Sequence, residues 1–165
     1  GEKHSERVFA MTLNNHRHLD TRLLTECDAW NGGEGEYMGA PLLIRYRSQL
    51  TRNVDLSNHP HLIIAQWSYS EHPSGMPSPD ELIAMNNFEA ALVDEVERDV
   101  LGVLVAVITN AGVRKWVFYA KNAEQFDQRF NTIAIKHPSE TSAPEIWFDP
   151  GWSHFFQDIV PEDGL

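Results

Sequence analysis

The stretch MPSPDELIAMNNFEAALVDEVERD, residues 76–99, decides the fold. It predicts a long helix that begins after Ser78, because serine is a good N-cap, Pro79 suits the first helical position, and Glu81 stands at capping-box spacing. At 100° per residue, one face is apolar apart from Glu89 and carries Leu82, Met85, Phe88, Leu92, Val93 and Val96. We therefore expect this helix to dock on an apolar surface with Glu89 inside or beside the contact.

The segments around this helix supply the strands for such a surface. Residues 61–69 (HLIIAQWSY) alternate between two faces, and residues 101–109 (LGVLVAVIT) are apolar throughout, as in a central strand. Residues 113–121 are predicted to pair with 101–109 as a hairpin, and residues 145–148 (EIWF) form a last short strand. Between these two strands, Asn122 caps a second helix whose stripe is Ala123, Phe126, Phe130 and Ile133.

This order of elements predicts an α+β fold. A strand, helix, strand, strand, helix, strand succession is typical of the ferredoxin-like βαββαβ plait, an antiparallel sheet with two helices on one face. We expect this domain to cover residues 41–160, with residues 42–47 (LLIRYR) as an added edge strand and a frayed tail at residues 161–165. The chain of 165 residues suits one domain.

Residues 1–40 are expected to form an N-terminal extension that packs on the domain, and its first thirty residues are expected to cover part of the open sheet face. Within it, residues 7–13 alternate weakly and are predicted as a strand, and residues 21–30 as a short helix. The run NGGEGEYMG at residues 31–39 is predicted as a flexible loop. Its glycines do not form a phosphate-binding loop, because no Lys-Ser/Thr pair follows them and their acidic neighbours repel phosphate.

The charge of the chain argues against whole classes of partner. The formal net charge is −11 and is spread over the sequence, so the surface repels phosphate backbones and nucleic-acid binding is not expected. Such a surface suits a basic protein partner or simply solubility. The one cysteine, Cys27, excludes an intrachain disulfide. No apolar run approaches the roughly 20 residues of a membrane span. We expect a cytoplasmic protein with no membrane contact, or alternatively an exported one whose leader was removed before Gly1.

Several short motifs, taken in order, resemble a known family. The chain is similar to the bacterial domain family of unknown function DUF695, over roughly residues 41–159, in Trp67–Ser68–Tyr69, Gly75–Met76–Pro77, Phe88–Glu89, the run GVRKWVFY at 112–119, and Asp149–Pro150–Gly151–Trp152. The resemblance implies a fold and a bacterial source, without an activity. A looser link connects such domains to the regulator of ribonuclease E activity B, a small acidic protein inhibitor.

Glu89 is the first candidate functional residue. A carboxylate within a helix–sheet contact can serve as a general acid, a general base or a ligand-fixing group, and such groups have perturbed pKa values. The structural alternative is a buried ion pair or an edge glutamate whose stem packs while its head reaches water. Plausible partners from the strands are Arg45, Arg114, Lys121 and Tyr119.

Histidine and cysteine offer weaker candidates for chemistry. The pairs His16/His18 and His59/His61 have the H-x-H spacing of some metal ligands, but no third ligand has characteristic spacing, so no metal site and no cofactor are expected. Cys27 stands on the apolar side of a predicted helix and is expected to be a buried small hydrophobe.

The aromatic residues give a further set of candidates. They could stack bases on an open sheet, although core or interface packing explains them better. Asp149 with Trp152 is expected to form an Asp-Pro turn. The residues with which we expect a ligand or partner to interact are Glu89, Trp67, Tyr69, Arg114, Tyr119, Asp149 and Trp152.

Two functions from different classes remain open. The absence of a catalytic constellation favours a non-enzymatic protein-binding or regulatory module of unknown oligomeric state. The alternative is a small-molecule binder or enzyme that uses Glu89 in an aromatic-lined pocket. What occupies the space between the main helix and its facing strands distinguishes the two.

Overall fold

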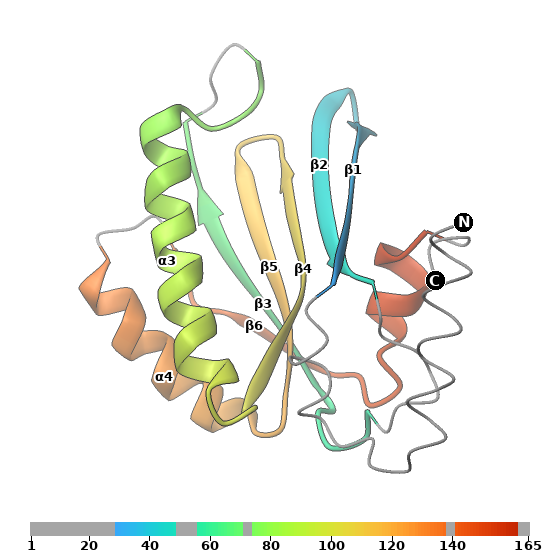
Figure 1. Ribbon diagram of the computed structural model, residues 1–165, viewed down its shortest axis with the longest axis vertical. Coiled ribbons are helices and arrows are strands. Elements are labelled where there is room, and N and C mark those ends of the chain that lie inside the picture. The colour runs from blue at the N-terminus through green and yellow to red at the C-terminus, as the bar shows by residue number, and fades with distance from the viewer. Residues whose placement is uncertain (1–28, 49–55, 71–73, 138–140, 162–165) are drawn as a thin grey trace.

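The computed structural model describes residues 29–48, 56–70, 74–137 and 141–161. These residues form one antiparallel sheet in the order β1-β2-β4-β5-β3-β6 (Figure 1). The elements are β1 (Trp30–Tyr37), β2 (Ala40–Arg47), β3 (His61–Ser68), α3 (Pro79–Glu97), β4 (Gly102–Asn110), β5 (Val113–Ala120), α4 (Ala123–Lys136), β6 (Glu145–Phe148) and the π-helix η1 (His154–Ile159). The strand predicted at residues 7–13, most of the helix predicted at 21–30, and the tail after residue 161 lie outside the described residues.

The predicted α+β class, with an antiparallel sheet and two α-helices, is confirmed. The strand order of the whole sheet is not that of a four-stranded plait, because the β1–β2 hairpin extends the sheet beyond β4. Figure 1 shows α3 and α4 on the same side of the sheet. Among the described residues, no helix combines the length and apolar character that a membrane span needs.

The prediction of a flexible loop at residues 31–39 was wrong. This run forms most of β1, which pairs with β2 along its full length, from Trp30 opposite Arg47 to Tyr37 opposite Ala40. Met38 and Gly39, with φ of 52° and 79°, make the two-residue turn between the strands. Glycine has a poor intrinsic strand propensity, so it is the continuous pairing with β2 that makes this run a strand.

The hairpin of β4 and β5 is the centre of the fold and is confirmed as predicted. Val103 pairs with Tyr119, and the two-residue turn at Ala111 and Gly112 has the positive φ values, 49° and 83°, of the favoured hairpin turns. Both faces of this hairpin are buried. One face packs against α3 and α4 through Met85, Phe88, Leu92, Val96, Phe126, Phe130 and Ile133.

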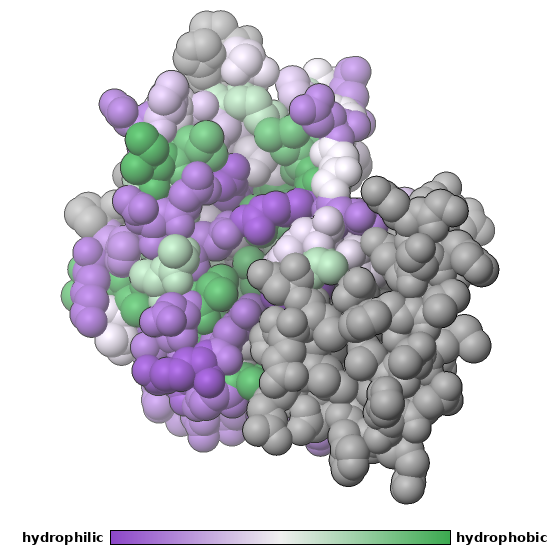
Figure 2. All heavy atoms as spheres, in the orientation of Figure 1, coloured by the Kyte–Doolittle hydropathy of each residue, from purple (hydrophilic) through white to green (hydrophobic). Residues whose placement is uncertain are grey.

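Helix α3 begins as predicted but buries a shorter stripe. The Ser78 hydroxyl accepts a hydrogen bond from the Glu81 amide at 3.2 Å, while the Glu81 carboxylate accepts one from the Ser70 amide and does not close the capping box. Leu82 was expected in the contact but is 37% exposed, because it lies one turn before Met85, where the buried stripe begins. Hydrophobic residues gather on the surface near this end of α3, whereas hydrophilic residues cover most of the outer face of the helix layer (Figure 2).

The C-terminal segment covers the second face of the sheet. Trp152 and the η1 residues Phe155, Phe156 and Ile159 join Val103, Val105, Val117 and Tyr119 in a second core. Sequence periodicity did not predict this π-helix, because its residues show only a cluster of aromatic side chains and no helical pattern. The second face is therefore partly closed by residues that follow β6.

A close approach of backbone to an aromatic ring fixes where β4 begins. A Cβ atom added at Gly102 would lie 2.8 Å from Phe126 Cε2 on α4, and Phe126 is fully buried, so the ring has nowhere to move. We expect Gly102→Ala to lower the free energy of unfolding by about 1–3 kcal/mol, measured by urea denaturation. The matched control is Gly35→Ala on β1, where nothing lies within 4 Å of the added Cβ, and an equal loss in both variants would contradict the prediction.

Candidate functional site

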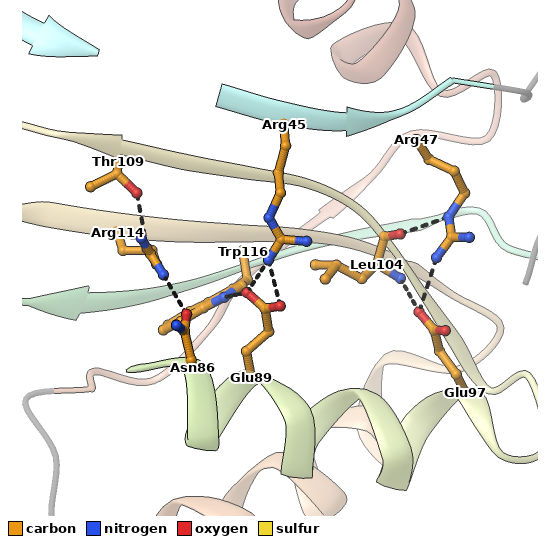
Figure 3. A network of polar contacts seen from close by, with 9 residues as sticks. All are labelled: Arg45, Arg47, Asn86, Glu89, Glu97, Leu104, Thr109, Arg114 and Trp116. Carbon is orange, nitrogen blue, oxygen red and sulfur yellow. Dashed lines mark hydrogen bonds and ion pairs between the residues drawn. The ribbon is translucent and has the colours of Figure 1, made fainter. Parts of the chain in front are cut away.

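Glu89 lies where α3 meets β2 and β5, and both of its carboxylate oxygens are bound. Arg45 Nη2 lies 2.6 Å from Oε1 and 2.5 Å from Oε2, and the Trp116 indole N–H donates to Oε1 at 2.8 Å (Figure 3). The Glu89 side chain is 17% exposed and that of Arg45 is 40% exposed. Of the four expected partners, Arg45 forms the ion pair; Trp116 was not foreseen, although it lies two residues after Arg114 on the same strand face.

Arg114 lies next to this pair but is held by neutral groups. Its Nε donates to the Thr109 hydroxyl at 2.9 Å and its Nη1 to the Asn86 side-chain oxygen at 3.1 Å. The residue is 7% exposed. Burial lowers the pKa of the Arg114 guanidinium, the charge of Glu89 raises it, and that of Arg45 lowers it. The arginine still keeps its proton at neutral pH, so a positive charge is buried here with hydrogen bonds only to uncharged partners.

A second ion pair between β2 and α3 lies nearer the C-terminal end of α3. Arg47 Nη2 lies 3.5 Å from Glu97 Oε2, and the Glu97 carboxylate also accepts the Leu104 amide at 2.9 Å (Figure 3). Arg47 in turn donates to the Leu104 carbonyl. The ring of Trp30 on β1 faces both guanidinium groups, with Arg45 Cζ at 5.2 Å and Arg47 Cζ at 4.7 Å from its centroid.

Trp67 and Tyr69 do not form an exposed stacking platform. Both are buried, at 5% and 7% exposure, and Trp67 contacts Phe88 and Trp116 edge-on at centroid distances of 5.6 and 6.4 Å. The Tyr69 hydroxyl donates to the Gly75 carbonyl at 3.2 Å. These two residues therefore belong to the core beneath α3, beside Glu89 but without access to a ligand from solvent.

Tyr119, Asp149 and Trp152 form a separate cluster on the other face of the sheet. The Tyr119 hydroxyl donates to Asp149 Oδ2 at 2.7 Å, and its ring stacks on Trp152 with centroids 4.2 Å apart and planes 8° apart. Partial burial alone would raise the pKa of Asp149, but hydrogen bonds from the His154 amide, the Tyr119 hydroxyl and the Ser153 amide together lower it. Burial, with the bond to Asp149, raises the pKa of Tyr119 above its ordinary range. The arrangement fixes the turn after β6 and the start of η1.

His59 is buried beside this cluster with one ring nitrogen unpaired. Its Nε2 lies 2.7 Å from the Val100 carbonyl, which can only accept, so Nε2 carries the hydrogen. Nδ1 has no hydrogen-bond partner in the described part of the chain. Burial lowers the pKa of His59 to about 4; the Val100 carbonyl opposes this shift and Lys121 adds to it.

Of the other histidine and cysteine candidates, only His61 lies among the described residues. His61 contacts the Phe148 ring at 5.8 Å, and within the described ranges no three His, Cys, Asp or Glu side chains could hold a metal ion. His16, His18 and Cys27 lie outside the described residues. The predicted absence of a metal site therefore stays a prediction for the whole chain.

The edge strand β6 carries an exposed apolar surface that the sequence analysis missed. Ile146, Trp147 and Phe148 are 45%, 58% and 73% exposed, although each belongs to a strand that pairs with β3. Beyond β6, the described residues offer no further strand. The EIWF pattern suits an edge strand and a central strand equally. The place of β6 at the edge of the sheet could therefore be recognised only from the strand order.

Comparison with known proteins gives one match. The model of a family of unknown function, DUF695, matches residues 28–159. The sequence motifs suggested that the similarity starts at residue 41, but the family match starts earlier, at residue 28. The earlier start agrees with the finding that β1 belongs to the sheet. No curated protein and no solved structure matches the chain, and nothing links it to the regulator of ribonuclease E activity B.

The ion pair of Glu89 is expected to contribute to stability. Glu89→Gln keeps an acceptor for Trp116 but leaves Arg45 without its counter-charge beside the buried cation of Arg114. Because Arg45 is partly solvated, we expect a loss of only about 1–2 kcal/mol in the free energy of unfolding, measured by urea denaturation. Glu95→Gln on the same helix breaks an exposed pair with Arg98 and should cost under about 0.5 kcal/mol. Equal losses would show that the Glu89 pair has no special role.

The buried His59 is expected to make the folding stability of the protein sensitive to acid. Its pKa is about 4 in the folded protein, whereas an unfolded histidine titrates near 6.5, so on acidification the unfolded state binds the proton first. The contribution of neutral His59 to the free energy of unfolding is complete above pH 6.5. It is lost as the pH falls toward 4, and the loss is up to about 3 kcal/mol. Asp99, with a pKa of about 2 set mainly by Arg129, titrates below this window.

The measurement is urea denaturation at intervals between pH 7 and 4, on the native chain and on His59→Gln. Glutamine can still donate to the Val100 carbonyl but does not titrate. We expect the variant to lose much less stability over this range than the native chain. Parallel curves for the two proteins would contradict the assignment to His59.

Proposed function

Because the chain belongs to DUF695, a family of unknown function, its role has to be inferred from its own residues, and we propose a non-enzymatic protein-binding module. In this proposal, β6 receives an extended, basic segment of a partner protein as an additional strand. The observation that carries it is the exposure of Ile146, Trp147 and Phe148 on an edge strand. Regulation of the bound partner would be a consequence of such binding.

Strand addition fits the chemistry of this edge. An edge strand presents unpaired backbone N–H and C=O groups, and soluble proteins usually protect such edges with charge, proline or a covering segment. β6 instead carries three large apolar side chains on its two faces: Ile146 and Phe148 on the side of Ile63 and His61, and Trp147 on the side of Leu62. Backbone pairing would supply affinity, and these side chains would supply specificity.

The charge of the chain favours a basic partner over a second copy. Two copies with a net charge of −11 each repel one another, and β6 begins with the acidic residue Glu145 and is followed by Asp149. A segment with lysine or arginine at alternate positions would complement these carboxylates and steer association. The same charge is the reason that we expect no nucleic acid to bind.

A role for Glu89 as an acid or base is less favoured. Both of its oxygens are engaged by Arg45 and Trp116, so neither is free to take a proton from a substrate. Asp149 is similarly occupied by Tyr119 and two backbone amides. We propose that these carboxylates hold the structure in place and that neither performs catalysis.

We also propose that the segment from β3 to β6 is a ferredoxin-like unit to which the β1–β2 hairpin has been added. This is supported by the partial order β4-β5-β3-β6 and by the placement of α3 between β3 and β4 and of α4 between β5 and β6. The hairpin occupies the β4 edge. In this reading, β6 is the edge of the unit that stays available.

The proposal is tested by selecting binders from a random peptide library displayed on phage. We expect enrichment of peptides that alternate Lys or Arg with β-branched residues, and slower amide hydrogen exchange at β6 when such a peptide binds. Phe148→Lys places a charge on the edge and should weaken peptide binding at least about tenfold. The matched control is Ile135→Lys on α4, where an 85% exposed apolar residue is replaced outside β6. Enriched peptides that bind both variants equally, or no enrichment, would refute the proposal.

A further inference from the structure

A hollow opens on the helical face of the sheet, between α3 and the β1–β2 hairpin. It encloses about 420 Å³, a volume within the usual range for small-molecule sites. Figure 2 shows hydrophilic residues running in a band across this face, with hydrophobic residues beside them. The hollow is lined by Gly32, Gly33, Glu34, Leu43, Ile44, Arg45, Val107, Thr109 and Arg114.

Hydrogen-bond donors without partners meet in this hollow. Arg45 uses only Nη2 for Glu89, so its Nε and Nη1 have no hydrogen-bond partner among the described residues. Arg114 uses Nε and Nη1, and in the same set of residues its Nη2 is left over. The Thr109 hydroxyl accepts from Arg114, which leaves its own hydrogen to donate. Three side chains of the lining therefore offer donors, and Arg114 is itself more than nine-tenths buried.

The charges around these donors limit the charge that a ligand can carry. Arg45 and Arg114 contribute two positive charges, and Glu89 supplies one negative charge that Arg45 already binds. Among the described residues, the hydrogen-bond partners of Arg114 are neutral, so an anion that reached its Nη2 would meet a positive charge with no carboxylate of its own. The exposed carboxylate of Glu34 on the wall of the hollow brings the formal sum of these charges to zero and opposes a ligand that carries more than one negative charge. A monoanion fits this balance better than a doubly charged phosphate.

The apolar part of the lining indicates what the anion is attached to. Leu43 and Val107 line the hollow beside the donors, and Gly32 on β1, which pairs with Arg45, leaves space where another residue would carry a side chain. A carboxylate accepts two hydrogen bonds from a guanidinium and carries one charge. A short hydrocarbon chain attached to it would lie against Leu43 and Val107.

We propose that this hollow is a binding site for a small organic monocarboxylate, held through its carboxylate by Arg45, Arg114 and Thr109 and through its apolar chain by Leu43 and Val107. The site is independent of the proposed strand addition at β6, since the lining includes no residue of that strand. Either proposal can therefore fail without the other.

The test is a titration of the full chain with hexanoate, followed by two-dimensional ¹⁵N NMR of the indole N–H groups. The Trp116 indole, which donates to the same carboxylate as Arg45, is the reporter and is assigned from Trp116→Phe. We expect a saturable shift with a dissociation constant of about 1 mM or tighter, as suits so small a ligand. Hexanol, which lacks the charge, and hexyl phosphate, which can carry two charges, should each bind at least about tenfold more weakly.

Variants separate this site from general ion binding. Arg45→Gln should weaken hexanoate binding at least about tenfold, and Arg45→Lys and Thr109→Val, which alter the donors and keep the packing, should weaken it several-fold. Arg98→Gln removes an exposed arginine that pairs with Glu95 and should leave binding unchanged. If Arg45→Gln does not fold, the other two variants decide. Hexanol or hexyl phosphate binding as tightly as hexanoate, or equal binding by every variant, would overturn the proposal.

Discussion

The structure depends on the burial of both faces of the β4–β5 hairpin. β4 is buried at nearly every position, so it needs an apolar cover on each side of the sheet. Helices α3 and α4 supply one cover, and Trp152 with η1 supplies the other. Each cover also brings its own polar groups into place: α3 brings Glu89 to Arg45, and the C-terminal segment brings Asp149 to Tyr119.

The charged residues of the helical face lie where this cover ends. α3 packs over β4, while the sheet continues through β2 and β1 beyond it. Side chains at such a boundary are neither fully packed nor fully solvated, which suits the long, amphipathic arginines Arg45 and Arg47. Glu89 and Glu97 face them from α3. Arg114 lies on β5, two strands farther in than β2, and among the described residues it receives no carboxylate of its own. The hollow beside it results from the same incomplete cover.

The elements from β3 to β6 could be predicted because their periodicity reflects burial, which also determines the fold, whereas η1 after them was not predicted. β1 could not, because its glycines become a strand only through pairing with β2, and no local pattern reports that pairing. Glu89 was recognised as the one carboxylate in an apolar stripe. Its partner could not be chosen among Arg45, Arg114 and Lys121, since this depends on β2 lying beside β4. The exposure of Trp147 and Phe148 could not be foreseen either, because it depends on the position of β6 at the edge of the strand order.

The two margins of the sheet differ in character, and this limits how the molecule can associate. The outer margin at β1 carries glycines and the exposed acids Glu34 and Glu36, which discourage any further strand from pairing there. The opposite margin, at β6, exposes apolar side chains and is the one at which we propose that a partner strand binds. A subunit that can pair a new strand at both edges of its sheet can polymerise without limit. A subunit that can pair a strand at one edge only stops after a single strand has been added. The asymmetry thus permits a discrete complex and disfavours fibres.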